Sequence, residues 1–207
     1  MFFQRAGASN RRRKAPGIIC HGRARQIASC HFRPGHGCKL LSLRDSDYPV
    51  SLMNEQFMKR AIELSRLHML QGAGGPFGAV IVKDGRIIGE GWNQVTSTND
   101  PTAHAEVVAI RKATQNMKAF DLQGAELYTS CEPCPMCLAA AYWARIKKIY
   151  FGNTRADAAK IQFDDDFIYR EIPKAIEERT IPMVQAMAKD AHKVFEEWDQ
   201  KSDKVRY

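Results

Sequence analysis

The sequence predicts an α/β fold, specifically a three-layer α/β/α sandwich with a mixed central sheet. Three observations support this prediction. Residues 54–70 repeat apolar side chains at helical spacing. Residues 77–91 contain two short apolar runs around the turn sequence KDGR, which is typical of a β-hairpin. Further along, two proline-marked helix starts alternate with short apolar strands, and this alternation indicates a sheet covered by helices on both faces.

The first helix is expected over residues 54–70, and the glycine-rich run 72–76 ends it. The first strand is expected over 77–82, and the chain returns along a second strand over 87–91. Asp100 and Pro101 predict the N-cap and first residue of a helix that runs to about Lys118.

A third strand is expected around residues 127–129, directly before a cluster of cysteines. Pro135 suits the first position of the following helix, which is expected to end at Trp143. A fourth strand is expected over 146–151 and a final helix over about 184–198. The predicted order is therefore α-β-β-α-β-α-β followed by more helix.

The net charge of +8 is confined to the start of the chain. Residues 1–44 hold ten Lys or Arg and no Asp or Glu, whereas residues 53–207 hold 21 basic and 21 acidic residues. A basic domain is the usual footprint of nucleic-acid binding, so we expect no nucleic-acid partner for residues 53–207. No apolar stretch approaches the 18 residues of a membrane span, and no membrane association is expected.

Residues 1–52 are expected to form a basic, disordered N-terminal extension of the domain at 53–207. Three interpretations stay open: an extension from an upstream start codon before Met53, an organellar transit peptide, or an unspecific disordered arm. Cys30, His31, His36 and Cys38 match no zinc module well. We expect a cytoplasmic protein, or an organellar one if the extension is a transit peptide.

The pattern that indicates chemistry is His104-Ala105-Glu106 followed by Pro133-Cys134-Pro135-Met136-Cys137. One imidazole and two thiolates leave a tetrahedral zinc ion one position short, and water fills that position in catalytic zinc sites. Zinc lowers the pKa of such a water to about 7. The spacing H-x-E…P-C-x-x-C is the signature of zinc deaminases that act on nucleobases.

The sequence therefore predicts one zinc ion per chain, held by His104, Cys134 and Cys137, with Glu106 as the group that moves protons. We expect both helix starts to converge there, because the N-terminal end of a helix stabilises thiolates. The competing interpretation is a closed structural zinc site in which Cys131 is the fourth ligand. It is disfavoured because it leaves Glu106 without a role.

Longer segments resemble the bacterial guanine deaminases of the cytidine-deaminase-like superfamily. The resemblance starts near Met53, continues to Tyr207, and is carried by residues 74–85, 99–106, 128–137, 163–169 and 177–182. The zinc motif alone identifies the superfamily, whereas the Phe-Asp-Asp segment at 163–165 and the final tyrosine narrow it to the guanine group.

This resemblance implies a substrate site made of several further residues. Asn93 matches the position that hydrogen-bonds the purine, and Asp165 matches a carboxylate that reads the guanine edge. Tyr207 matches a C-terminal tyrosine that covers the site, while Phe77 and Trp143 are candidates for packing on the substrate ring. The resemblance also implies a homodimer whose subunits exchange their C-terminal segments, and therefore a site that uses residues of both chains.

The function expected from these features is zinc-dependent hydrolysis of guanine to xanthine and ammonia. A tRNA adenosine deaminase shares the zinc motif but is expected to need a basic surface for RNA. Deamination of another nucleobase or nucleoside, guanosine included, and a binding module with structural zinc are the remaining alternatives.

Overall fold

The computed structural model describes residues 53–163 and 165–206, all of which belong to one unit that spans Tyr48–Tyr207. The predicted N-terminal extension, Tyr207 and Asp164 lie outside the described residues. Within the described part of the chain, no helix is both long and apolar enough to cross a membrane.

The sheet has four strands in the order β2-β1-β3-β4. The strands are β1 (Gly78–Lys83), β2 (Arg86–Trp92), β3 (Glu126–Cys131) and β4 (Lys148–Asn153). Strand β1 pairs antiparallel with β2 and with β3, whereas β3 pairs parallel with β4. This mixed sheet confirms the predicted fold class and the predicted hairpin.

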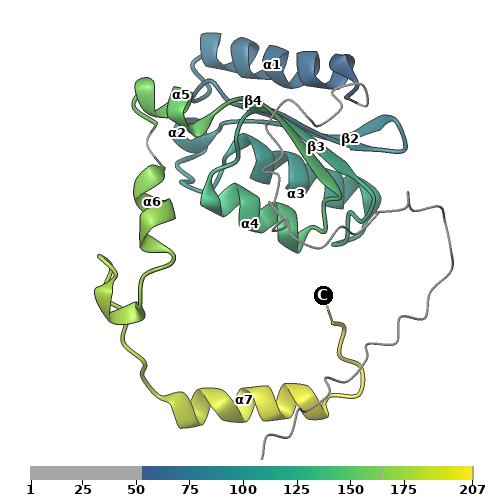
Figure 1. The fold of residues 1–207 in the computed structure, drawn as a ribbon. Coiled ribbons are helices and arrows are strands. Elements are labelled where there is room, and N and C mark those ends of the chain that lie inside the picture. Colours follow the sequence, from purple (N-terminus) through teal and green to yellow (C-terminus); the bar gives the residue numbers. More distant parts are fainter. Residues whose placement is uncertain (1–52, 164, 207) are drawn as a thin grey trace, which may run out of the picture. The chain divides into compact units, whose positions relative to one another are not determined.

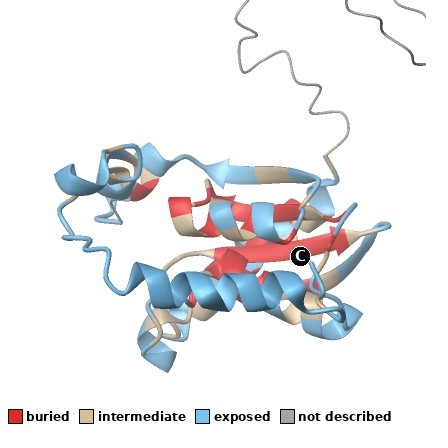
Figure 2. Cartoon of the chain, turned by 90° about the horizontal axis from the view of Figure 1, so that it is seen from below, coloured by how far each residue is buried: buried red, intermediate tan, exposed pale blue. Residues whose placement is uncertain are grey.

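Helices cover both faces of this sheet (Figure 1). Helix α1 (Glu55–Leu70) packs on one face, and α3 (Ala105–Met117) and α4 (Pro135–Trp143) pack on the other. Strand β1 is buried on both sides, because Val80 and Val82 contact the α1 cluster while Ala79 and Ile81 contact the α3 and α4 cluster. Buried residues accordingly gather in the sheet and in the helix faces turned to it (Figure 2).

Helix α3 begins later than the sequence indicates, and the predicted start at Asp100 is wrong. The side chain of Asp100 accepts hydrogen bonds from the backbone and the hydroxyl of Thr102, at 2.8 and 2.6 Å, and so stabilises a turn instead of a helix start. The N-cap is His104, which has extended backbone dihedral angles. The following residue opens the helix, so the histidine lies at the helix entrance.

The remaining elements lie in the sequence between the strands or after the last strand. They are α2 (Val95–Thr98), α5 (Arg155–Lys160), α6 (Asp166–Glu171), a 3-10 helix (Ile176–Glu178) and α7 (Ala188–Gln200). Helix α5 begins with a capping box, in which Thr154 and Asp157 exchange hydrogen bonds. Neither α6 nor α7 contains a fully buried residue.

Candidate zinc-dependent active site

Two helix starts on the same face of the sheet bring the predicted metal ligands together. His104 is the N-cap of α3 and Cys134 is the N-cap of α4, with Pro135 at the first helical position. Cys137 lies in the first turn of α4 and is fully buried. The two helices share one hydrophobic cluster beneath the sheet, so their N-termini are held at a fixed separation.

The three donor atoms form a nearly equilateral triangle. Nδ1 of His104 lies 3.5 Å from Sγ of Cys134 and 3.5 Å from Sγ of Cys137, and the two sulfurs are also 3.5 Å apart. Zn–S bonds of about 2.3 Å and Zn–N bonds of about 2.0 Å in tetrahedral geometry place such donors about 3.5 to 3.8 Å apart. These residues therefore form a group able to bind zinc, and its three donors fit one ion.

The fourth ligand of a closed site is missing from this group. Among the described residues, the cluster that could hold a metal contains His104, Cys134 and Cys137 but not Cys131. The thiol of Cys131 is buried and contacts the carbonyl oxygen of Thr154 at 3.7 Å. Burial also raises the pKa of this thiol to about 11.

Cys134 is prepared to act as a thiolate. The hydrogen bond with Cys137, together with contacts from His104, lowers the pKa of the Cys134 thiol to about 4. The backbone N–H groups at the start of α4 favour the same charge state. The same hydrogen bond raises the pKa of the Cys137 thiol, so Cys137 has to release a proton when zinc binds.

Glu106 lies in the first turn of α3 and is only 5% exposed. The hydroxyl of Thr129 donates a hydrogen bond of 2.9 Å to its Oε1 atom. Burial raises the pKa of this carboxyl group above its usual value. A buried carboxylate with a raised pKa is a better proton acceptor than one in water, which suits a general base.

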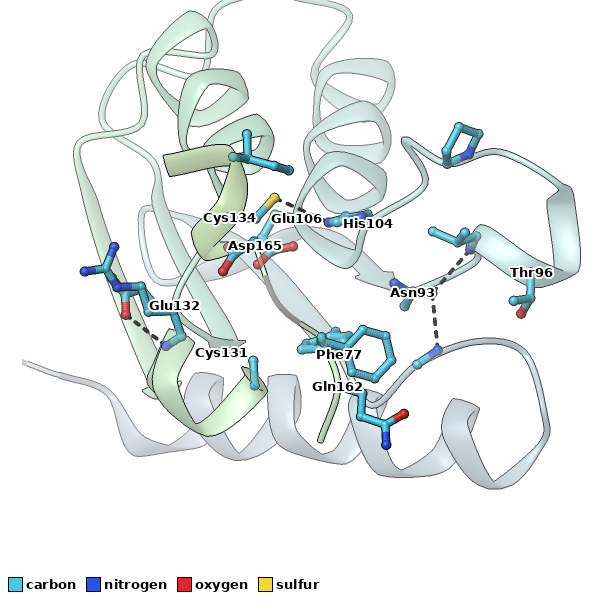
Figure 3. Close-up of a pocket in the computed structure, with 17 residues that line it drawn as sticks. Phe77, Asn93, Thr96, His104, Glu106, Cys131, Glu132, Cys134, Gln162 and Asp165 are labelled. Carbon is cyan, nitrogen blue, oxygen red and sulfur yellow. Dashed lines mark hydrogen bonds between the residues drawn. The ribbon is translucent and has the colours of Figure 1, made fainter. Parts of the chain in front are cut away.

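Beside these groups the protein contains a cavity of about 470 Å³, which is the size of a typical small-molecule site. Figure 3 shows that its labelled lining residues come from segments distant in the sequence. The predicted site residues that line it are Phe77, Asn93, His104, Glu106, Cys134 and Asp165.

Asn93 is held in place by its side-chain oxygen, as the dashed lines in Figure 3 show. The oxygen accepts hydrogen bonds from the backbone N–H groups of Gly75 at 3.2 Å and Val95 at 3.3 Å. Because both bonds use the oxygen, the amide nitrogen is the end of the side chain that can donate to a ligand.

Asp165 is the N-cap of α6, and its side chain makes no capping hydrogen bond with the helix. Burial, and then the negative charge of Cys134, raise the pKa of its carboxyl group. Phe77 packs edge-to-face against Phe163, with ring centroids 4.9 Å apart. Both rings line the cavity and form an apolar wall.

Trp143 is not among the described residues that line this cavity, and Tyr207 is not among the described residues. Trp143 ends α4 and is 69% exposed. The proposed contact of either side chain with a substrate stays a prediction.

Sequence reasoning missed several lining residues, namely Phe163, Arg155, Glu132 and Gln162. Of these, Phe163 and Glu132 had a signal in the sequence, because they lie in the segments 163–169 and 128–137 that carry the family resemblance. The partner of Glu106, Thr129, was read only as part of a strand.

Comparisons with known proteins agree with this geometry. Residues 52–153 match the family model described as cytidine and deoxycytidylate deaminase zinc-binding region. The fold and the site therefore define a zinc deaminase of this class.

The chain is 54% identical to guanine deaminase of Bacillus subtilis over 154 residues, which are 74% of this chain and 99% of that protein. The solved structure of that enzyme superposes with a TM-score of 0.73, covering 75% of this chain and 99% of the other. The chain belongs to this guanine deaminase family.

Other relatives are more distant. A guanine deaminase structure from Nitrosomonas europaea is 31% identical, has a TM-score of 0.52, and covers 55% of this chain and 65% of its own. The tRNA-specific adenosine deaminase of Haemophilus influenzae is 41% identical over 122 residues, or 56% of this chain and 70% of that protein.

Proposed function

We propose that this protein hydrolyses guanine to xanthine and ammonia. The observation that carries the proposal is the position of Glu106, which is buried beside a three-donor zinc group and opens on a cavity that Asn93 and Asp165 also line. The identity of 54% over nearly the full length of the B. subtilis guanine deaminase favours guanine over other bases.

His104, Cys134 and Cys137 would hold the zinc ion, which supplies a water molecule that is reactive near neutral pH. Glu106 would accept a proton from this water and pass it to a ring nitrogen, and the water oxygen would add to the carbon that bears the exocyclic amine. Glu106 would then take the remaining proton from the added oxygen and deliver it to the departing amine, so that the carbon–nitrogen bond breaks and ammonia leaves. Thr129 fixes Oε1 of Glu106, so Oε2 is the oxygen that exchanges protons.

The other site residues would bind and orient the purine. The amide nitrogen of Asn93 donates a hydrogen bond to the base, and Asp165 accepts from its donor edge. Phe77 packs on the ring, with Phe163 supporting it. We propose that Tyr207 covers the site as part of a lid and that Trp143 also contributes to ring packing.

We infer that the active form is a homodimer with exchanged C-terminal segments. The supporting observation is α7, in which the large apolar side chains Val194, Phe195 and Trp198 are 59%, 72% and 45% exposed. Apolar residues clustered on a surface helix indicate a protein contact. A second copy of the chain would bury them, and in such a dimer Tyr207 would serve the site across the interface.

A tRNA adenosine deaminase is the second candidate, because the H. influenzae enzyme is 41% identical. Against it, residues 53–207 hold equal numbers of basic and acidic residues and offer no net attraction for RNA. We propose a small-molecule purine as the substrate and no nucleic-acid partner. We infer a reducing, cytoplasmic location, because Cys131, Cys134 and Cys137 are free thiols.

The test is a panel of zinc-loaded reactions scored for released ammonia, with guanine, guanosine, adenine, cytosine and an anticodon stem-loop as substrates. We expect rapid release from guanine and none from adenine. In Glu106→Gln, kcat should fall by about 10²- to 10⁴-fold with unchanged zinc content, because the proton carrier is lost while the ligands stay.

Glu55→Gln is the matched control, since Glu55 is exposed and pairs only with Lys59 on the surface of α1. It should keep full activity. If ammonia is released from the stem-loop but not from guanine, the substrate is RNA and the proposal is wrong. If Glu106→Gln is fully active, Glu106 does not carry protons in the reaction.

A further inference from the structure

Helix α6 carries Asp165 at its start, yet it has little packing of its own to hold it in place. It has six residues and none of them is buried. Its apolar side chains Phe167 and Ile168 are 49% and 44% exposed. A short helix with so little burial is not fixed by hydrophobic contacts, so the position of Asp165 requires another explanation.

Tyr169 supplies a specific contact between this helix and residues 132–134, the loop between β3 and α4 that we call the zinc-binding loop. Its hydroxyl donates a hydrogen bond of 3.0 Å to the carbonyl oxygen of Pro133. Pro133 directly precedes Cys134, so the hydrogen bond ends one residue from a zinc ligand. The distance and the partly buried setting make this a well-formed hydrogen bond.

Arg155, the first residue of α5, contacts both Tyr169 and the zinc-binding loop. Its guanidinium carbon lies 4.9 Å from the centroid of the Tyr169 ring, which is a cation–π contact. Its backbone N–H donates to Oε2 of Glu132 at 3.0 Å, shown as the dashed line at Glu132 in Figure 3. The start of α5, the zinc-binding loop and α6 are therefore joined around the Tyr169 side chain.

The spacing along α6 connects this junction to Asp165. Tyr169 follows Asp165 by one helical turn, and its backbone N–H lies 3.3 Å from the Asp165 carbonyl oxygen. Residues four apart lie on the same face of a helix. Fixing Tyr169 on the zinc-binding loop thus fixes the backbone of Asp165, whose side chain has no capping bond to hold it.

We propose that Tyr169 is a positioning residue, which docks α6 on the carbonyl of Pro133 and so holds the Asp165 carboxylate at the cavity. This inference rests on the proposed role of Asp165 in binding guanine. Arg155 contributes to this positioning indirectly, because its guanidinium group packs on the ring of Tyr169.

Tyr169→Phe removes the hydroxyl and keeps the ring under Arg155. We expect kcat/KM for guanine to fall by about 10- to 100-fold, because small displacements of a positioning group have effects of this size. Zinc content and the midpoint of urea unfolding should change little. The matched control is Tyr142→Phe, because Tyr142 is 77% exposed on α4 and does not line the cavity.

A double-mutant cycle separates positioning from general structural damage. If Tyr169 acts through Asp165, then Tyr169→Phe should change kcat/KM less than about twofold in an Asp165→Asn background. An equal loss in both backgrounds, or wild-type kinetics for Tyr169→Phe alone, overturns the inference.

Hydrogen exchange gives a second measurement that does not depend on turnover. The amides of Ile168, Tyr169 and Ile172 are hydrogen-bonded within α6 and should exchange faster in Tyr169→Phe than in wild type and in Tyr142→Phe. If the wild-type enzyme releases no ammonia from guanine, the proposed function fails and the exchange result alone decides on the docking. If the α6 amides exchange at the wild-type rate in Tyr169→Phe, the proposed docking of α6 by Tyr169 is wrong.

Discussion

At the scale of single residues, the site depends on contacts that give ordinary side chains unusual properties. Glu106 is buried, which raises the pKa of its carboxyl group, and one oxygen is held by Thr129. Cys131 and Cys134 lie three residues apart and yet have opposite properties. Burial raises the pKa of the Cys131 thiol, which contacts a backbone carbonyl, whereas the hydrogen bond with Cys137 lowers the pKa of Cys134, which lies among the metal ligands.

Thr129→Val tests the support of Glu106. The substitution keeps the shape of the side chain but removes the hydroxyl that fixes Oε1. Because hydrogen bonds to charged groups contribute about 1.5 to 3 kcal/mol, we expect kcat/KM for guanine to fall by about 10- to 100-fold. Steady-state ammonia release measures the effect.

Thr114→Val is the control for that experiment, since the Thr114 hydroxyl is exposed and bonds only to the carbonyl of Arg111 in its own helix. It should behave as wild type. Equal activity of Thr129→Val and Thr114→Val would show that the hydroxyl of Thr129 does not support catalysis.

The residues of the candidate site could be predicted from the sequence, whereas most of the contacts that support them could not. His104, Glu106, Cys134 and Cys137 are close in two short motifs, so their spacing alone predicts that they meet. Phe163 and Tyr169 lie in a segment that carries the resemblance, but no pattern predicts their contacts with Phe77 and Pro133, which are 86 and 36 residues away in the sequence. Long-range packing of this kind does not appear in local patterns.

At the scale of elements, the site depends on how closely α3 approaches the sheet. Gly89 and Gly91 of β2 have no side chains where α3 crosses them. A Cβ atom at Gly91 would lie 2.2 Å from the carbonyl oxygen of Ala105, and one at Gly89 would lie 2.4 Å from that of Ala109. These contacts are with the helix backbone, so a larger residue has to displace the helix.

Gly91→Ala is expected to destabilise the fold by about 1–3 kcal/mol and also to weaken zinc binding. Zinc binding is affected because Ala105 directly follows the ligand His104, so a displacement of Ala105 also moves His104. Gly89→Ala is the matched control, because it presses on α3 one turn further from the site. Urea unfolding and competition with a colorimetric chelator measure the two effects.

Both variants should lose stability, but only Gly91→Ala should lose zinc affinity clearly. Wild-type zinc affinity in Gly91→Ala would show that the β2 contact does not set the position of His104.

The elements themselves show where local signals are sufficient. The hairpin was predicted well, because its turn sequence and its apolar runs act over a few residues. The start of α3 was predicted wrongly, because an Asp-Pro pair suits both a helix start and a turn, and the hydrogen bonds from Thr102 to Asp100 decide for the turn.

At the scale of the whole molecule, the C-terminal helix is the feature that the described chain leaves unexplained. Helix α7 has a charged side and an apolar side, and every residue of it is exposed. The proposed exchange between two subunits gives this apolar side a partner.

If the chain forms the proposed dimer, Phe195→Asp is expected to convert it to monomers, because the substitution places a charge on the apolar side of α7. Sedimentation velocity measures the change. Lys193→Asp is the control on the charged side, where Lys193 forms an exposed pair with Asp190, and it should stay dimeric. A monomeric wild-type protein, or a dimeric Phe195→Asp, would contradict the exchange.

The proposed reaction requires a zinc ion with three protein ligands and one coordination position left for water. Zinc-edge X-ray absorption on the loaded protein tests it most directly. We predict two sulfur atoms and one imidazole nitrogen around the ion, a fourth light atom that no side chain supplies, and the same spectrum for Cys131→Ser. A count of three sulfurs that drops to two in Cys131→Ser would contradict the account, because Cys131 would then close the site.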